Sequence, residues 1–228
     1  MANATRPDIS FAVNLLARSS SKPTKRHWAG IKQVLRYLRG TEDYGLFYSK
    51  ERASEELVGY ADAGYLSDPH SGHSQSGYVF LSGGTAISWR SAKQSTVATS
   101  SNYAEIIALH EASKECVWIR SIQQHIQSSC GMKVLDLPTV VHEDNAACIH
   151  QMKSGYIKGD RTKHIAPKMF HTKELIDKSV IDLQYVKSDD NVADIFTKSL
   201  PAYKHWAIMP KLGLRSLREL ELDSKRCI

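Results

Sequence analysis

Three short runs of alternating apolar and polar residues decide the fold of this chain: LVGYADAGY at 57–65, SGYVFL at 76–81 and TAISW at 85–89. Alternation with a period of two, together with aromatic and β-branched residues, is typical of strands. A polar loop follows the first run, and the tight-turn sequence Ser82-Gly83-Gly84 separates the second from the third. We therefore expect three consecutive antiparallel strands.

Downstream the pattern changes to helices that alternate with two further strands. The expected elements are a long helix from Tyr103 to about Ile126, a strand at Thr139–His142, a short helix ending near Met152, a helix at Ile165–Asp177, a strand at Val180–Val186 and a helix at Asn191–Lys198. A strand that follows a helical crossover pairs in parallel. The predicted fold class is α/β, with a mixed five-stranded sheet flanked by helices.

The first fifty residues are predicted to form a helical extension with an uneven charge. Helical spacing of apolar residues occurs at Pro7–Arg18 and again at Thr24–Arg39. Nine Lys or Arg and three Asp or Glu residues lie in 1–50, whereas the rest of the chain balances its charges. The basic residues on one face of the second helix are Lys25, Lys32, Arg36 and Arg39. This face is expected to contact the phosphates of a nucleic acid, although an ordinary solvated helix face has the same pattern.

Composition limits the class of protein. The 228 residues are 42% hydrophobic, which is enough for a globular core. No apolar run reaches the roughly 18 residues that a membrane span needs, and the N-terminus lacks the core of a signal peptide. The four cysteines include no CxxC pair, so neither a zinc site nor a disulfide framework is expected. These observations predict a protein that is not secreted, with a cytoplasmic or nuclear location.

Four carboxylates are placed where one site can form, namely Asp62, Glu105, Asp144 and Asp194. Asp62 lies in the middle of the first predicted strand, and Asp144 follows the fourth. Glu105 lies one turn into the long helix, and Asp194 begins the last one. Each acid taken alone is more often a helix cap or a surface charge. Together, at strand ends and helix starts, they predict a shared site, because ligands gather at the carboxyl ends of strands in α/β sheets.

Gathered carboxylates repel one another unless cations neutralise them. Four oxygen ligands without sulfur or imidazole favour Mg²⁺, with Mn²⁺ as a substitute, over zinc. Two such ions would stabilise the attacking water and the leaving oxygen of a phosphodiester. The predicted chemistry is therefore metal-assisted phosphoryl transfer without a covalent nucleophile.

The residues from the first strand onward resemble a known family. The stretch from GYADAGYLSDPH to SSNYAEIIALHEASKECVWIR, followed by HEDNAACI, GDRTKHI and VADIFTKSLP, is similar to the ribonuclease H domain of copia-type LTR retrotransposon Pol polyproteins. The match covers residues 57 to about 215, and residues 1–50 resemble the end of the reverse transcriptase in the same polyproteins. The resemblance implies three parts: a reverse-transcriptase remnant at 1–50, a ribonuclease H-like domain at 51–200 and a basic helical tail at 201–228.

The resemblance also implies a role for particular residues. Asp62, Glu105, Asp144 and Asp194 match the acids that bind two Mg²⁺ ions and carry out catalysis in the family. The expected contacts to sugar and phosphate are Ser101, Asn102, Asn145, Arg161, Lys163 and His164. The implied substrate is an RNA/DNA hybrid, whose 2′-hydroxyls distinguish the strand that is cut. The implied partner is the upstream reverse-transcriptase domain, and the implied location is a cytoplasmic retrotransposon particle or the nucleus.

Two departures from the family pattern bear on activity. The loop at 187–190 holds no histidine before the last acid, so modest turnover is expected, and no Tyr-x-Asp-Asp motif is present for DNA polymerisation. Two other interpretations stay open: a catalytically degenerate remnant that only binds nucleic acid, and an integrase-type strand transferase. The second is disfavoured because such enzymes end their acid series with Glu, whereas the last acid here is Asp194.

Overall fold

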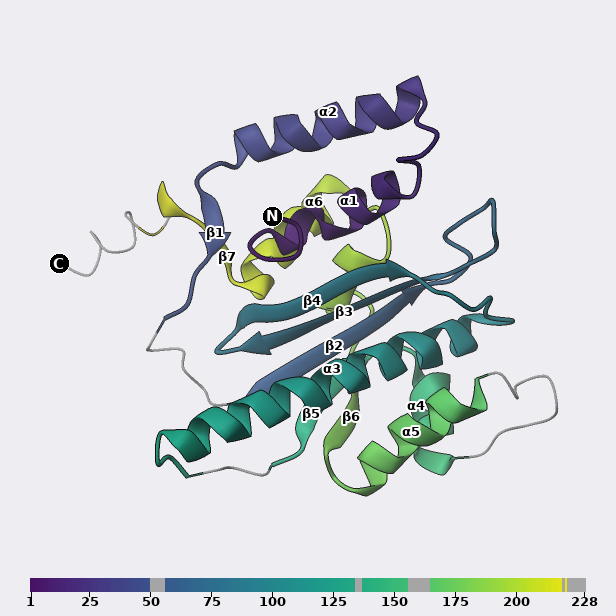
Figure 1. Cartoon of the computed structure of the whole chain (residues 1–228), viewed down its shortest axis with the longest axis vertical. Coiled ribbons are helices and arrows are strands. Elements are labelled where there is room, and N and C mark those ends of the chain that lie inside the picture. The colour runs from purple at the N-terminus through teal and green to yellow at the C-terminus, as the bar shows by residue number, and fades with distance from the viewer. Residues whose placement is uncertain (50–55, 134–136, 156–164, 219, 221–228) are drawn as a thin grey trace.

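A five-stranded mixed sheet forms the centre of the molecule (Figure 1). The computed structural model of the chain describes residues 1–49, 56–133, 137–155, 165–218 and 220. The sheet has the order β4-β3-β2-β5-β6. Its strands are β2 (Leu57–Gly64), β3 (Gln75–Ser82), β4 (Thr85–Lys93), β5 (Thr139–Glu143) and β6 (Ile181–Tyr185). The predicted α/β fold class is confirmed.

The pairing of the strands follows the prediction. β2 pairs with β3 and β3 with β4, both antiparallel, whereas β5 joins β2 and β6 joins β5 in parallel. Because β5 pairs with β2, the central strand lies between an antiparallel and a parallel neighbour. Asp62, which pairs with Gly77 across the β2–β3 ladder, is therefore in the middle of the sheet.

Helices cover both faces of the sheet (Figure 1). One face carries α3 (Ser101–Ser129), α4 (Ala146–Ser154) and α5 (Ala166–Asp177). This layer encloses a core that includes Phe80, Ile106, Leu109 and Leu183, each of them fully buried. α3 begins at its N-cap Ser100, whose side chain accepts a hydrogen bond from the backbone N–H of Tyr103. That cap fixes the position of Glu105 close to the sheet.

The opposite face is covered by segments from both ends of the chain (Figure 1). From the N-terminal part come the 3-10 turn η1 (Pro7–Ile9), α1 (Ser10–Ala17) and α2 (Lys25–Gly40), and from the C-terminal part come the 3-10 turn η4 (Val192–Phe196), α6 (Ala202–Ile208) and the 3-10 turn η5 (Met209–Leu212). The strands β1 (Tyr44–Leu46) and β7 (Leu214–Ser216) pair as a separate antiparallel sheet. The predicted segments 1–50 and 201–228 thus contact each other.

A buried polar network links the N-terminal segment to α6. Arg6 and Asp8 form an ion pair with an N–O distance of 2.7 Å, and both side chains are almost fully buried. The Tyr37 hydroxyl of α2 donates to Asp8 over 2.7 Å and lies 3.1 Å from Nε2 of His205 in α6. Charges buried in this way need a fixed geometry, so the network sets how α2 and α6 lie against each other.

The predicted helix at Asn191–Lys198 is wrong in type, because the segment forms the 3-10 turn η4 at Val192–Phe196. The turn packs closely on the sheet: a Cβ added to Gly77 would lie 2.7 Å from the Phe196 Cβ and 2.7 Å from a Thr197 methyl group. So close a packing leaves no space for a side chain at position 77. Phe196, the last residue of the turn, is fully buried against the sheet.

Gly77→Ala is expected to lower the free energy of unfolding by about 2 kcal/mol, because a methyl group would be forced against the buried η4 turn. Gly40→Ala is the matched control, since no atom lies within 4 Å of its added Cβ. Urea unfolding followed by circular dichroism measures both variants. Equal stability of the two variants would show that η4 is not packed as described.

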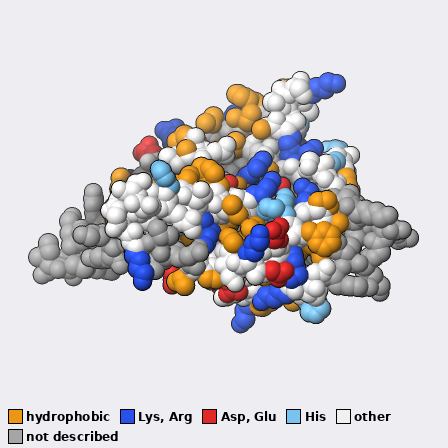
Figure 2. Space-filling model, turned by 60° about the horizontal axis from the view of Figure 1, so that its bottom comes forward, with side chains coloured by type: hydrophobic (Ala, Val, Ile, Leu, Met, Phe, Trp, Pro, Cys, Tyr) orange, Lys and Arg blue, Asp and Glu red, His pale blue; other side chains and the backbone are white. Residues whose placement is uncertain are grey.

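The surface carries charges of both signs. On the face that Figure 2 shows, lysine and arginine side chains lie between acidic and hydrophobic ones rather than forming a single patch. α2 buries none of its residues fully, and Trp28 and Leu35 are 58% and 57% exposed. Within the described ranges, no helix is both long and apolar enough to cross a membrane.

Candidate active site

Three of the four predicted acids come together at one end of the central strands. Asp62 comes from β2, Glu105 from the first turns of α3, and Asp144 directly follows β5. Each offers a carboxylate oxygen, and these three oxygens lie within 4.8 Å of one another. Distances of this size let a single cation contact several carboxylates, so the arrangement is one that could hold a divalent metal ion.

Burial changes the acidity of this cluster. Asp62 is 2% exposed, and its burial raises its pKa to about 6. The positive charge of Lys198 opposes this shift, and the negative charge of Asp194 adds to it. Burial and then the charge of Glu143 raise the pKa of Glu105 well above its ordinary value. Carboxylates without compensating charge in a dry site favour the protonated form. A divalent cation would supply the missing charge.

Glu143 is a further member of the cluster that the sequence did not single out. It is the last residue of β5 and fully buried, and its Oε1 accepts a hydrogen bond of 3.2 Å from the backbone N–H of Asn145. Burial and the charge of Asp144 raise its pKa well above the ordinary value. The signal was its place two residues after buried Val141, on the same face of the strand.

Asp194 lies outside this group of three acids, near Asp62, and is bound by lysines. Its Oδ1 is 2.7 Å from Nζ of Lys198, and its Oδ2 is 2.8 Å from Nζ of Lys204 in α6. The Lys198 ammonium group also lies 3.6 Å from Asp62 Oδ2. Two lysines thus neutralise the side of the site where Asp62 and Asp194 face each other. A cation that bound there would have to compete with both.

Two buried oxygen atoms support the fit to a metal ion. Glu105 Oε2 and Glu143 Oε2 find no hydrogen-bond donor in the part of the chain that the structure describes. Buried acceptors without a donor are costly, and a cation or an ordered water would satisfy them. The donor set consists of carboxylate oxygens, which are the ligands that hard divalent ions prefer.

Three of the predicted nucleic-acid contacts flank the acids. Asn102 lies in the first turn of α3 and donates from Nδ2 to Gln151 over 2.6 Å, while its buried Oδ1 has no donor among the described residues. Asn145 is the N-cap of α4 and accepts a hydrogen bond from the backbone N–H of Cys148. Ser101 is exposed at the start of α3. Ser101 and Asn102 thus lie in the first turn of α3, just before Glu105, and Asn145 directly follows Asp144.

The predicted basic contacts are separate from this cluster. Lys25, Lys32, Arg36 and Arg39 are all exposed on α2, on the sheet face opposite α3 (Figure 1). Arg161, Lys163 and His164 lie outside the described residues.

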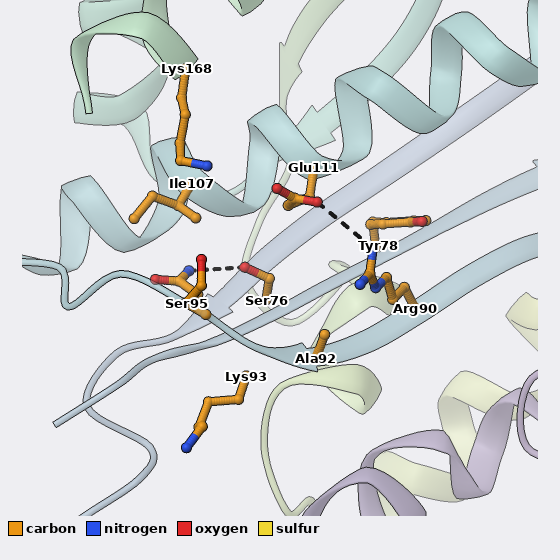
Figure 3. A pocket seen from close by; sticks show the side chains of 10 residues that line it. Ser76, Tyr78, Arg90, Ala92, Lys93, Ser95, Ile107, Glu111 and Lys168 are labelled. Atoms are coloured by element: carbon orange, nitrogen blue, oxygen red, sulfur yellow. Dashed lines mark hydrogen bonds and ion pairs between the residues drawn. The ribbon is translucent and has the colours of Figure 1, made fainter. Parts of the chain in front are cut away.

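A small cavity of about 150 Å³ lies between β3, β4, α3 and α5 (Figure 3). Lys168 extends from α5 over α3, and Arg90 of β4 lies 3.8 Å from the Glu111 carboxylate. Lys114 pairs with the same carboxylate at 2.9 Å. Arg90, Lys93 and Lys168 line the cavity together with one carboxylate, that of Glu111, so the cavity is basic, in contrast to the acidic cluster.

Comparison with known proteins places the chain in a family. No family model matches it. It is 34% identical over 212 residues to the retrovirus-related Pol polyprotein from transposon TNT 1-94 of Nicotiana tabacum, a match that covers 93% of this chain and 15% of that protein. The Pol polyprotein from transposon RE2 of Arabidopsis thaliana is 33% identical over 210 residues, covering 92% of this chain and 14% of that protein.

Two other similarities are partial. Secreted RxLR effector protein 161 of Plasmopara viticola is 47% identical over 115 residues, which is 50% of this chain and 80% of that protein. Among solved structures, LC11-RNase H1 in complex with an RNA/DNA hybrid covers 62% of this chain and 94% of that chain, with a TM-score of 0.45 and 21% identity.

The chain spans about 15% of the length of the Pol polyproteins that it matches. The similarity to them extends over more than nine tenths of this chain. Its mixed sheet has the strand order expected of a ribonuclease H-like domain. The chain therefore belongs to the copia-type retrotransposon Pol polyproteins.

Proposed function

We propose that the chain is a metal-dependent endonuclease that hydrolyses the RNA strand of RNA/DNA hybrids as part of a retrotransposon Pol polyprotein. One observation carries the proposal: carboxylates from β2, α3 and the end of β5 converge within 4.8 Å. A cluster of acids without a bound cation would only destabilise the fold, because each negative charge makes the other carboxyl groups harder to ionise. A cation-binding function explains why they are kept together.

In this proposal Asp62, Glu105 and Asp144 hold the metal, and Asp194 completes the site on the side of η4. Two Mg²⁺ ions, or Mn²⁺ in their place, would supply charge for the attacking water and the leaving oxygen when bound. Burial of the carboxylates keeps bulk water from screening that charge. The cluster offers oxygen ligands only, which favours these hard ions over zinc.

The substrate contacts are part of the same proposal. Asn102 would contact the sugar of the RNA strand, whose 2′-hydroxyl group distinguishes it from DNA. Ser101 and Asn145 would contact the sugar and phosphate beside the metal. Arg161, Lys163 and His164 would hold the backbone of the hybrid, and the exposed basic face of α2 would bind phosphates further away.

The proposal extends to the context of the chain. The segment 1–50 would be the remnant of a reverse transcriptase, followed by the ribonuclease H-like domain at 51–200 and the tail at 201–228. The partner would be an upstream reverse-transcriptase domain, in a cytoplasmic retrotransposon particle or in the nucleus. The pairing of β1 with β7 supports a close association of the first and last of these segments.

A second candidate is a catalytically degenerate domain that binds nucleic acid without cutting it. The observation in its favour is that both oxygens of Asp194 are bound to lysines, Lys198 and Lys204. If those ion pairs persist in solution, the last acid is unavailable to a second cation. Hybrid binding without cleavage at any concentration of Mg²⁺ or Mn²⁺ would establish this candidate.

The deciding experiment is cleavage of an end-labelled RNA/DNA hybrid by the full chain, with Mg²⁺, with Mn²⁺ and with EDTA. Double-stranded RNA and double-stranded DNA of the same sequence serve as controls. Cleavage of the RNA strand of the hybrid, dependent on the cation, is the expected result. Cleavage that persists in EDTA, or that is equal on all three duplexes, would contradict the proposal.

A further inference from the structure

The η4 turn is attached to the central strand at several points near Asp62. The side chain of Asn191, its N-cap, donates to the backbone carbonyl of Ala61 over 2.8 Å, and both groups are buried. The backbone carbonyl of Thr197 lies 2.6 Å from where a Cβ on Gly64 would be. The absence of a side chain at Gly64 therefore allows the end of the turn to approach β2 directly.

This attachment brings the Thr197 hydroxyl to the candidate metal site. Thr197 is fully buried, and its Oγ1 donates to Asp62 Oδ2. The Asp194 backbone carbonyl lies 3.2 Å from the same hydroxyl. Among the described residues, none donates a hydrogen bond to the other oxygen of the Asp62 carboxylate, Oδ1. The two oxygens of Asp62 are therefore in different environments.

We propose that Thr197 is a positioning residue for Asp62. Its hydroxyl holds Oδ2 against the η4 turn and thereby leaves Oδ1 directed to the cation that Asp62, Glu105 and Asp144 would share. The hydroxyl adds a directional hydrogen bond at Oδ2, where the Lys198 ammonium group lies 3.6 Å away, and a carboxylate held in one rotamer loses less entropy when the cation binds. Partners that orient a metal ligand typically change metal affinity by about 10- to 100-fold when removed. The inference rests on the proposed metal-binding function.

If the Thr197 hydroxyl had only a structural role, its loss would lower the stability of the fold without changing the affinity for the cation. A buried hydroxyl also stabilises the fold by satisfying its neighbours, and its loss leaves a buried acceptor unpaired. Thr172 offers a matched control, because it is equally buried and its hydroxyl donates to the Lys168 backbone carbonyl over 3.1 Å, away from the acids. Loss of that hydroxyl removes a buried hydrogen bond without affecting the orientation of a ligand.

The test is Mn²⁺ binding to the full chain by isothermal titration calorimetry at pH 7.5. Thr197→Val, which keeps the shape and removes the hydroxyl, is expected to weaken the affinity about tenfold, whereas Thr197→Ser and Thr172→Val should bind as the parent does. Should Thr197→Val not fold, Thr197→Ala makes the same comparison without a methyl group at the position of the hydroxyl. Parent-like affinity in the folded variant, or an equal loss in Thr172→Val, would overturn the inference.

The outcomes separate this inference from the function on which it rests. A parent chain that binds no Mn²⁺ would refute the proposed metal site and the positioning role together. A parent that binds Mn²⁺ with unchanged affinity in Thr197→Val would refute the positioning role alone. Thermal unfolding in EDTA adds a measurement that is independent of metal: Thr197→Val should destabilise the parent chain more than it destabilises Asp62→Ala, because alanine offers no acceptor for the Thr197 hydroxyl.

Discussion

Replacing Asp144 with asparagine is expected to reduce Mg²⁺-dependent cleavage of an RNA/DNA hybrid by at least about 10³-fold, because the site loses one of the three charges that hold the cation. The amide has nearly the same shape as the carboxylate, so the fold should be retained. Removing one of several neighbouring acids also relieves repulsion, since the charge of Asp144 raises the pKa of Glu143. The metal-free variant should therefore be at least as stable as the parent.

The control for this prediction is Asp177→Asn, at the end of α5. Its carboxylate is 58% exposed and ion-paired with Lys173 on the same helix, away from the cluster. Cleavage rates of both variants on the labelled hybrid, with thermal unfolding in EDTA, separate loss of chemistry from loss of structure. Parent-like cleavage by Asp144→Asn would contradict the assignment of the site. If the unfolding temperature of Asp144→Asn decreases strongly, Glu105→Gln removes another of the three charges and serves as the test.

The strands and most helices were predictable because each has a local pattern. The alternation in 57–65 and 76–81 matches β2 and β3 closely, and the apolar spacing after Tyr103 predicts most of α3. The η4 turn was not, because its conformation depends on contact with Gly77, which is distant in the sequence. The pairing of β1 with β7 likewise depends on residues more than 160 positions apart, and three-residue strands carry almost no periodicity.

The site was predictable to the extent that residue type and strand ends determine it. Asp62, Glu105 and Asp144 converge as expected. Lys204 was missed because a lysine in a basic C-terminal segment has no feature that indicates a partner, and only the placement of α6 brings it to Asp194. Thr197 was missed for the same reason: a threonine hydroxyl gains a role from the acceptor that it reaches, which the sequence does not show.

A divalent cation is expected to raise the unfolding temperature of the chain strongly at pH 7.5 and only weakly at pH 5. Binding to the folded state alone stabilises it by about 4 kcal/mol at a free cation concentration of about 1,000 times Kd, which is roughly 10 °C for a chain of this size. Protons compete with the cation for the same oxygens. Because burial raises the pKa of Asp62 to about 6, its carboxylate is mostly protonated at pH 5 and mostly charged at pH 7.5.

The same shift predicts the behaviour without metal. The pKa of Asp62 in the folded state lies above its value in the unfolded chain. Between about pH 4 and pH 6 the folded state therefore keeps a proton that the unfolded chain releases. The stability gained from binding this proton is lost as the pH rises through 6. His110, whose pKa is lowered to about 4 mainly by burial, acts with the opposite sign, so the comparison is between the parent and Asp62→Asn. Differential scanning fluorimetry at pH 5 and pH 7.5, in EDTA and in Mn²⁺, measures all four states. In EDTA, the stability of Asp62→Asn relative to the parent should be greater at pH 7.5 than at pH 5. In Mn²⁺, Asp62→Asn should lose most of the increase in unfolding temperature that the parent shows. An equal increase in both proteins would contradict a cation site at Asp62.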